Sequence, residues 1–281
     1  MTPPGGERPP SAEVPPRSYP PGRAACELLA NLIGRELKAR YKGSALGFLW
    51  ALLTPLFMAA IYVFFLRLLA GRGVPVEEVI IGVFAWTFTA QSVQGGLTAI
   101  TGHANLVKKV AFRRALLPTA TTAANAVNYL LSLVVQFLVV GWLLARQGSF
   151  FSAWTVALPA VFVVHAVLNL ALALLLSAAN VYFRDTQHLV GVGLSAWFFV
   201  SPVMYNLALL ERWSAARPWL VRLYALNPLA PILTAYRAAL LPGAAFPWNG
   251  WMLAGLALPW ALLLVAAAVF RRAQRNFADW L

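Results

Sequence analysis

Six apolar stretches dominate this sequence, and each is long enough to cross the hydrocarbon core of a bilayer as a helix. They lie near residues 46–69, 79–101, 117–145, 153–182, 187–207 and 250–270. A helical span needs about 20 predominantly apolar residues. Because backbone polar groups in lipid must pair with each other, these stretches are predicted to be α-helices. The chain is therefore predicted to be an all-α membrane protein with six transmembrane helices.

The chain has two parts that differ in composition. Residues 1–24 contain eight prolines with charged and small residues, a composition typical of disorder. Over all 281 residues the chain is 60% hydrophobic and only 11% charged, whereas about a quarter of a soluble domain is charged. We therefore predict a disordered Pro-rich cytoplasmic tail over residues 1–25 and one transmembrane domain over residues 26–281.

Lysines and arginines sit in short clusters between the apolar stretches, and the net charge is +13. This placement favours membrane orientation over nucleic-acid binding, because cytoplasmic loops of membrane proteins are enriched in basic residues. With both termini in the cytoplasm, 15 basic residues lie inside and seven outside. We therefore predict that both termini are cytoplasmic and that nucleic acid is not a partner.

The segment 208–249, between the fifth and sixth stretches, differs from the spans. It contains five prolines and apolar pieces of only 10 to 13 residues. Pieces of that length are too short to cross a bilayer and are typical of interfacial or re-entrant helices. We predict re-entrant helices on the outer side, before the last span.

The stretch 28–45, just before the first span, has the pattern of an amphipathic helix. Apolar residues from Leu29 to Tyr41 share one face, with Arg35, Lys38 and Lys42 opposite them; such a helix lies in the headgroup layer. Arg40 falls on the apolar side, four residues after Glu36, where an ion pair can form. Two interpretations remain open. The helix is either an orientation anchor, or a site at which Arg35, Lys38, Arg40 and Lys42 bind an anionic lipid headgroup or a partner.

The loop 104–114, between the second and third spans, alternates cations with apolar residues. The cations are Lys108, Lys109, Arg113 and Arg114, and the apolar residues are Leu106, Val107, Val110 and Phe112. A loop that only sets orientation needs the cations alone, and its apolar residues would be exposed without reason. The pattern therefore favours a short helix whose apolar residues pack against another protein surface.

Several kinds of chemistry are missing from the sequence. No G-x-x-x-x-G-K-[ST] motif occurs, so the chain does not bind ATP through a P-loop. No acidic residue lies in the middle of a span, which disfavours coupling to ions. Cys26 is the single cysteine, and no Cys/His cluster has metal-ligand spacing. We therefore expect no catalytic residue, metal or cofactor in this chain, and we interpret His165 in the fourth span as a packing residue.

Aromatic residues are frequent in the first and fifth spans. Their rings offer flat faces to the C–H faces of sugars, and Trp and Tyr add a polar edge. We predict that Trp50, Phe65, Phe198 and Tyr205 include pore-lining residues. The alternative is that these rings contact lipid or form interfacial belts.

Four blocks of the sequence resemble the polysaccharide ABC exporter permeases, the membrane subunits of ABC-2 transporters for O-antigen or teichoic acid. The first, from Leu32 to Pro55, reads LIGRELKARYKGSALGFLWALLTP. The others follow in the family's order: Asn105 to Pro118, Asn180 to Asp185 with Ser201 to Tyr205, and Asn227 to Arg237. One departure is Arg113, where members of the family carry proline.

This resemblance implies a channel-forming subunit of an ATP-driven exporter in the bacterial inner (plasma) membrane. It implies a homodimer of this chain, two copies of a separate ABC ATPase subunit that binds ATP and Mg²⁺, and a lipid-linked polysaccharide as substrate. It also identifies residues 104–114 as the coupling helix that docks on the ATPase. The channel would lie at the dimer interface.

Two rival interpretations remain. An ABC exporter for a drug or small lipid shares this topology but does not need an aromatic lining, and the first block favours the polysaccharide group. A membrane-embedded glycosyl- or acyltransferase needs acid, base or metal-binding groups clustered at one membrane face. The chain offers only the scattered Asp185, His188 and Glu211.

Overall fold

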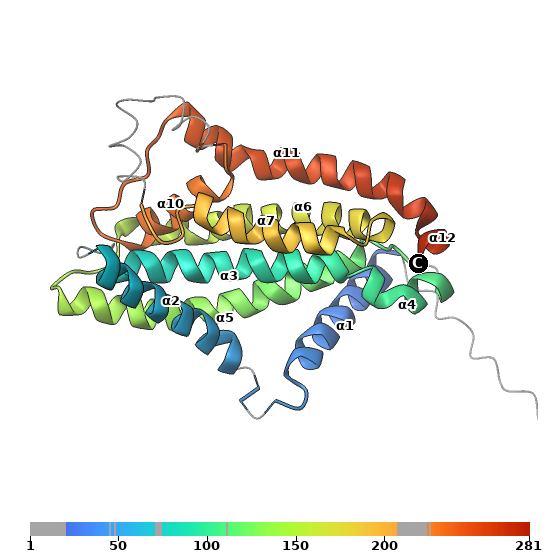
Figure 1. Ribbon diagram of the computed structural model, residues 1–281, viewed down its shortest axis with the longest axis horizontal. Helices are drawn as coiled ribbons and strands as arrows, with labels where there is room; N and C mark the ends of the chain where they lie inside the picture. Colours follow the sequence, from blue (N-terminus) through green and yellow to red (C-terminus); the bar gives the residue numbers. More distant parts are fainter. Residues whose placement is uncertain are drawn as a thin grey trace, which may run out of the picture.

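Helices make up every regular element that a computed structural model describes in this chain (Figure 1). The description covers residues 21–44, 46–47, 49–70, 75–110, 112–206, 224 and 226–281. The elements are α1 (Pro21–Tyr41), α2 (Leu49–Ala70), α3 (Val76–Thr98), η1 (Thr101–His103), α4 (Ala104–Lys109), α5 (Leu116–Arg146), η2 (Ala153–Ala157), α6 (Leu158–Tyr182), α7 (Thr186–Val200), α10 (Leu229–Leu240), α11 (Gly250–Ala273), η3 (Gln274–Asn276) and α12 (Phe277–Trp280). The all-α class is as predicted.

Four helical segments are long and apolar enough to cross a membrane. They are Leu49–Leu68, Leu116–Arg146, Ala153–Tyr182 and Gly250–Trp280. Helices occur at all six predicted stretches, but α3 carries two glutamates in its first turn and α7 has only 15 residues. The described chain is therefore a multi-pass membrane protein with four clear spanning segments.

The long helices lie lengthwise beside one another, with α3 inside (Figure 1). Helix α3 packs against α5 and α6, α2 flanks α3, α11 runs along α6, and α1 leans on α5. Helices α1, α4 and α12 gather at one end of the bundle, which we call the α4 end, and α10 lies at the other, the α10 end. The chain's C-terminus is at the α4 end.

Close helix contact explains how α3 occupies the centre. A Cβ built on Gly96 would lie 2.5 Å from the Ala173 Cβ of α6, so the two backbones approach closely through small residues. Between the same helices, the Asn180 side chain donates to the Leu97 carbonyl at 3.0 Å. Side-chain amides of this kind bridge membrane helices and pair polar groups away from water.

The buried side chains form two clusters. The larger extends from the middle of the bundle to the α10 end and includes Phe84, Phe88, Tyr129 and Tyr236. The smaller, which we call the α4-end cluster, contains Leu32, Ile100, Val107, Val181, Phe270 and Phe277 among others. The α4-end cluster joins helices from both termini of the described chain.

Helix α1 differs from the predicted segment in its bounds and contacts. It begins at Pro21, inside the predicted tail, and ends at Tyr41; residues 1–20 lie outside the described part. Leu32 is buried in the α4-end cluster, so part of the apolar face packs on protein and not on lipid. Of the predicted re-entrant segment, α10 is described and mostly buried, while residues 207–223 and 225 are not described.

Candidate functional site

The predicted docking element lies at the α4 end, in α4 and the residues that follow it. Val107 points into the bundle and is buried, whereas Lys108, Lys109 and Arg113 are exposed. Val110 leaves α4 in an extended conformation, with its side chain 51% exposed. Among its described residues, the element therefore presents three exposed cations around the exposed side chain of Val110.

Leu106 and Phe112, two further residues of the predicted docking element, have another role within the chain. Both are half-buried, and both pack against the α4-end cluster. Burial of such side chains contributes about 1.5–3 kcal/mol each when complete. They therefore fasten α4 to its own bundle, and Val110 is the apolar side chain of this element that is free to contact a partner.

The C-terminal segment supports the docking element from the other side. The Arg114 side chain donates to the Gln274 carbonyl, and the Tyr182 hydroxyl at the end of α6 donates to the Ala273 carbonyl at 2.7 Å. Helix α12 contacts both α4 and α6, and its Phe277 ring lies 6.0 Å from the Tyr182 ring. The docking element is therefore joined to α6 and to the end of α11 by packed and hydrogen-bonded contacts.

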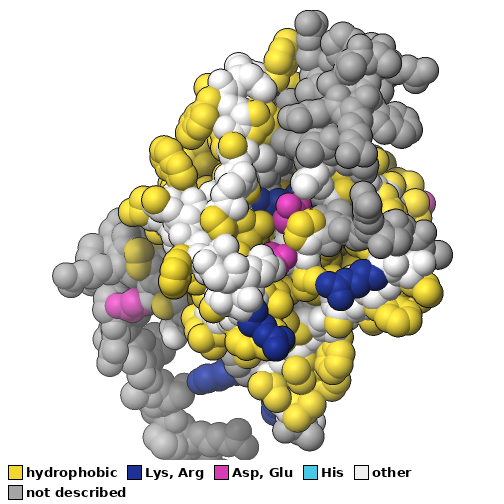
Figure 2. Space-filling view, turned by 90° about the vertical axis from the view of Figure 1, so that its left-hand side faces the viewer, with side chains coloured by type: hydrophobic (Ala, Val, Ile, Leu, Met, Phe, Trp, Pro, Cys, Tyr) yellow, Lys and Arg dark blue, Asp and Glu magenta, His cyan; other side chains and the backbone are white. Residues whose placement is uncertain are grey.

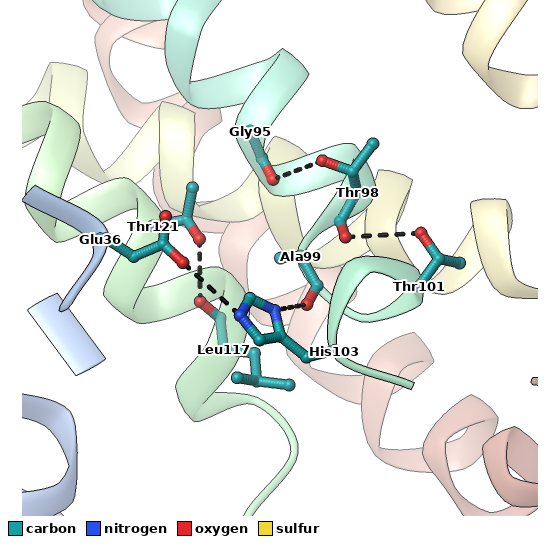
Figure 3. A network of polar contacts seen from close by, with 8 residues as sticks. All are labelled: Glu36, Gly95, Thr98, Ala99, Thr101, His103, Leu117 and Thr121. Atoms are coloured by element: carbon teal, nitrogen blue, oxygen red, sulfur yellow. Dashed lines mark hydrogen bonds and ion pairs between the residues drawn. The ribbon is translucent and has the colours of Figure 1, made fainter. Parts of the chain in front are cut away.

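His103 connects α1 to the beginning of the docking element (Figure 3). Its Nδ1 lies 2.9 Å from the Ala99 carbonyl oxygen, and its Nε2 lies 3.8 Å from Glu36 Oε1. Because a carbonyl only accepts, Nδ1 is the nitrogen that carries a hydrogen in this contact, and Nε2 faces the Glu36 carboxylate. Glu36 thus pairs across to η1, where the sequence predicted a partner at Arg40 on the same helix.

The basic side of α1 borders an open groove. Arg35, Lys38 and Lys42 line it together with apolar side chains of α5 that include Val127 and Leu131, and its volume is ≈ 1060 Å³. All three cations are exposed. The groove thus combines cations on one wall with apolar surface on the other.

Arg40 turns away from this groove. A Cβ built on Gly95 of α3 would lie 3.6 Å from the Arg40 Nη2. Its guanidinium therefore reaches toward α3, and it stands apart from the other three cations with which the sequence grouped it.

The four aromatic residues predicted near a pore occupy different environments. Trp50 and Phe65 are exposed on α2, while Phe198 is 6% exposed and stacks edge-on with Trp86 at 5.4 Å. The Tyr205 hydroxyl lies 3.1 Å from the Val200 carbonyl, to which it donates. Of these four rings, Trp50 and Phe65 are exposed, Tyr205 is half-buried and Phe198 is buried.

Phe199 is exposed, whereas its neighbour Phe198, which the sequence analysis placed among the candidate pore-lining residues, is buried. It is 66% exposed on α7 and packs edge-on against Phe198. The sequence shows an unbroken run of apolar residues here, so nothing in it distinguishes the inward residue from the outward one.

A polar cluster that the sequence did not predict lies at the α10 end, centred on Arg237 of α10. Arg237 is 4% exposed. Its Nη1 donates to the Tyr205 carbonyl at 2.8 Å, and its Nη2 donates to the carbonyls of Val203 at 3.0 Å and Glu78 at 3.2 Å. It thus joins α10, α3 and the segment after α7. Arg237 belongs to one of the four blocks that resemble the exporter permeases, and this was the only feature of the sequence that could have pointed to it.

Two glutamates at the start of α3 border a cavity beside Arg237. The cavity is ≈ 600 Å³ and is lined by Glu77, Glu78, Asn206 and Arg237 among other residues. Gln147 donates to Glu77, and Asn206 donates to Glu78 at 3.3 Å. Figure 2 looks onto this end and shows acidic side chains within its central hollow. The hydrogen-bond partners of both carboxylates are side-chain amides, and Arg237 bonds the Glu78 backbone carbonyl, so this arrangement fits a structural junction.

His165 lies in the middle of the larger cluster and is fully buried. Its Nε2 is 2.7 Å from Thr89 Oγ1 on α3, and the rings of Phe88 and Tyr236 contact it edge-on at 4.8 and 5.8 Å. This environment agrees with its interpretation as a packing residue.

Apolar helices of spanning length, together with a basic and partly apolar element at one end, define a membrane subunit that works with a partner. Residues 27–241 match the family described as ABC-2 type transporter, and the chain belongs to this family. It is a transport subunit and not an enzyme.

Three curated relatives bear the name O-antigen export system permease protein RfbA. The chain is 36% identical to one from Myxococcus xanthus over 255 residues, which cover 90% of this chain and 94% of the relative. Two from Klebsiella pneumoniae are 27% identical over 220 residues, with coverage of 77% and 81%, and 25% identical over 257 residues, with coverage of 90% and 94%.

Proposed function

We propose that this chain is the channel-forming membrane subunit of an ATP-driven exporter that moves lipid-linked polysaccharide across the bacterial inner membrane. The cargo is O-antigen or a teichoic-acid-like polymer. The observation that carries the proposal is the 36% identity to an O-antigen export permease over 90% of this chain. The four blocks that resemble the same group of permeases also support it.

In this proposal the energy comes from two copies of an ABC ATPase subunit, which hold ATP and Mg²⁺. Lys108 and Lys109 at the end of α4, with Val110 directly after it, form the outward surface on which the ATPase docks. Movement of that surface is transmitted through Arg114 and α12 to the spanning helices, since these contacts are packed and hydrogen-bonded. The chain itself catalyses no bond chemistry.

We extend the four clear spans to six, with α3 and α7 as the additional two. Helix α3 tolerates its polar residues because α2, α5 and α6 surround it, and a shielded helix needs less apolar surface than one facing lipid. Helix α7 is about 22 Å long at 1.5 Å per residue, and residues 201–206 continue it toward the α10 end. Both termini are then cytoplasmic, with α1 along the membrane surface.

Cysteine labelling tests this orientation in a Cys26→Ser background. Asn276→Cys at the α4 end is expected to react with a membrane-impermeant maleimide only from the cytoplasm, because basic residues gather there. Gln147→Cys at the α10 end is expected to react only from outside. Three further positions lie outside the described residues. Cysteines at positions 12 and 111 are expected to react only from the cytoplasm, and a cysteine at position 215 only from outside. Labelling of position 215 or 147 from the cytoplasm contradicts the six-span topology.

The pore is proposed to lie between two copies of this chain. Helices α2 and α7 carry many exposed large apolar residues, including Phe57, Phe65 and Phe199, and surfaces of this kind mark contacts with lipid or another protein. In a homodimer these faces meet around a path, along which exposed rings stack weakly on successive sugars. Trp50 and Phe65 remain the best candidates, and Phe199 joins them.

The cations on and directly after α1 are proposed to bind the substrate as well. We propose that Arg35, Lys38 and Lys42 hold the phosphate of the substrate's lipid carrier, with its apolar chain against the α5 wall of the groove. Cations beside apolar surface suit an anionic amphiphile, and each adds about 1 kcal/mol near an anionic surface.

The function is tested by ATP-dependent export of lipid-linked polysaccharide in cells or vesicles carrying the chain and its ATPase. The double variant Trp50→Ala with Phe65→Ala is expected to lower export about tenfold, because each lost stacking contact contributes about 0.5–1.5 kcal/mol. ATP turnover should continue, since neither residue touches the α4 end. Phe150→Ala, at an exposed ring outside the spans, is the matched control.

Two results contradict parts of this proposal. Export at the wild-type rate in the double variant assigns these rings to lipid contact. Transport of a drug or small lipid without polysaccharide by the wild-type complex favours the rival type of exporter.

A further inference from the structure

An apolar groove runs between α2 and α5 toward the α10 end of the bundle. Its volume is ≈ 870 Å³. Its walls include Leu56, Ala60, Phe64 and Leu68 from α2, and Val139 and Leu143 from α5. The groove faces outward between two spanning segments, so the surrounding lipid has access to it.

Two arginines stand at the end of this groove that is nearest the membrane surface. Arg67 lies in the last turn of α2, Arg146 in the last turn of α5, and both are exposed. The Arg146 guanidinium lies 4.7 Å above the Trp142 ring, which helps to orient it. Within the described residues the one ion pair is that of His103 with Glu36, at the other end. Neither arginine therefore has a carboxylate partner among the described side chains.

The length of the groove matches one leaflet of a bilayer. From Leu56 to Leu68 the wall of α2 is about 18 Å long, at 1.5 Å per residue, and one leaflet of the hydrocarbon core is about 15 Å thick. The cations lie at the surface end, and the apolar walls extend toward the midplane. This is the polarity of a phospholipid, which has an anionic head and an apolar chain.

We propose that this groove binds an anionic phospholipid of the leaflet at the α10 end. The phosphate contacts Arg67 and Arg146, and one acyl chain lies between α2 and α5. Arginine suits this role because its planar guanidinium donates several hydrogen bonds to phosphate oxygens. A second copy of this chain fits less well here, because the described glutamates at this end lie within the Arg237 cavity and are not available to pair with these arginines. The site serves a resident lipid and goes beyond the transport of a polysaccharide.

The test is lipid binding to the purified full-length chain with its ATPase, measured by native mass spectrometry after titration with phosphatidylglycerol or phosphatidylcholine. We expect the wild-type complex to retain phosphatidylglycerol preferentially. Arg67→Gln with Arg146→Gln should weaken its binding roughly thirtyfold, or about 2 kcal/mol, because each cation near an anionic lipid contributes about 1 kcal/mol. Phosphatidylcholine binding should change little.

A second variant tests the groove without touching the arginines. Ala60→Trp fills the apolar wall from an exposed position on α2 and should also displace the bound lipid. Arg184→Gln, which removes an exposed arginine at the other end, is the matched charge control and should leave binding unchanged.

Three outcomes overturn the proposal. The first is phosphatidylglycerol binding that survives both groove variants. The second is a co-purified polyprenyl phosphate in place of a phospholipid, which assigns the groove to the substrate's lipid anchor. The third is a change in dimer content without a change in bound lipid, which assigns the groove to a second copy of the chain.

Discussion

Val110→Glu is expected to release the ATPase subunit from this chain while the membrane bundle stays folded. Val110 is exposed beside Lys108 and Lys109, and a glutamate there would remove an apolar contact from the interface and add a charge that has to be desolvated on docking. Contacts at the buried centre of an interface dominate binding, and their loss weakens it by about 2 kcal/mol or more, roughly thirtyfold. Co-purification of the ATPase with the permease measures this directly.

Lys108→Glu with Lys109→Glu is expected to weaken the same association in a manner that depends on salt. Charges at the rim of an interface mainly steer association, so this defect should shrink as ionic strength rises. The control is Arg271→Glu with Arg272→Glu, which reverses two charges in the last turn of α11 and should leave the ATPase bound. If Val110→Glu retains a bound and export-competent ATPase, α4 is not the docking element, and the basic face of α1 becomes the next candidate.

Leu106 and Phe112 are poor positions for this test, although the sequence pattern selects them. Both pack against the α4-end cluster, and a polar residue at either would destabilise the chain itself. Loss of the ATPase from such a variant would not distinguish a damaged interface from a damaged fold. The side-chain orientations in the folded bundle show which residues of the loop can be changed without damage to the fold.

Gly82→Ala is expected to destabilise the chain strongly, because the α10-end junction leaves no room for a side chain. A Cβ on Gly82 would lie 2.0 Å from the Val203 carbonyl oxygen and 3.0 Å from the Arg237 Nη2. Relief of this overlap would separate α3 from the segment after α7 and break hydrogen bonds of the buried Arg237. We expect a cost of about 3 kcal/mol or more, or a fall of roughly 10 °C in the apparent melting temperature.

The measurement is the fraction of detergent-solubilised protein that remains monodisperse by size-exclusion chromatography after heating. Gly102→Ala is the matched control, since a Cβ there would meet nothing within 4 Å, and its melting temperature should equal that of the wild type. Wild-type stability in Gly82→Ala would show that α3 and the segment after α7 are not in such close contact.

The positions of the long helices follow from the sequence to within a few residues. Helices α2, α5, α6 and α11 occupy the predicted apolar stretches, because within lipid an apolar run has to form a helix that satisfies its own backbone. The absence of a nucleotide motif and the basic, partly apolar loop 104–114 were likewise readable, since they depend on residue type and order alone. The family followed from four short blocks.

The sequence could not settle which side of each helix faces the protein. In an almost wholly apolar segment, periodicity carries little information, because lipid and protein interior accept the same side chains. Phe198 is therefore buried and Phe199 exposed with no signal to separate them. In the same way, Glu36 pairs with His103 and not with Arg40, because η1 lies close to α1 only after the bundle is packed.

The sequence alone thus determined that this chain is an all-α membrane protein of exporter type, with a basic and partly apolar loop at residues 104–114. Tertiary structure decided which residues of that loop are available, and it brought Arg237 into contact with α3 across 159 positions of sequence. The physical reason is that composition and short-range order determine where a segment partitions and whether it is helical. The exposure of a side chain and the partners of a buried charge depend on helices that are distant in the chain.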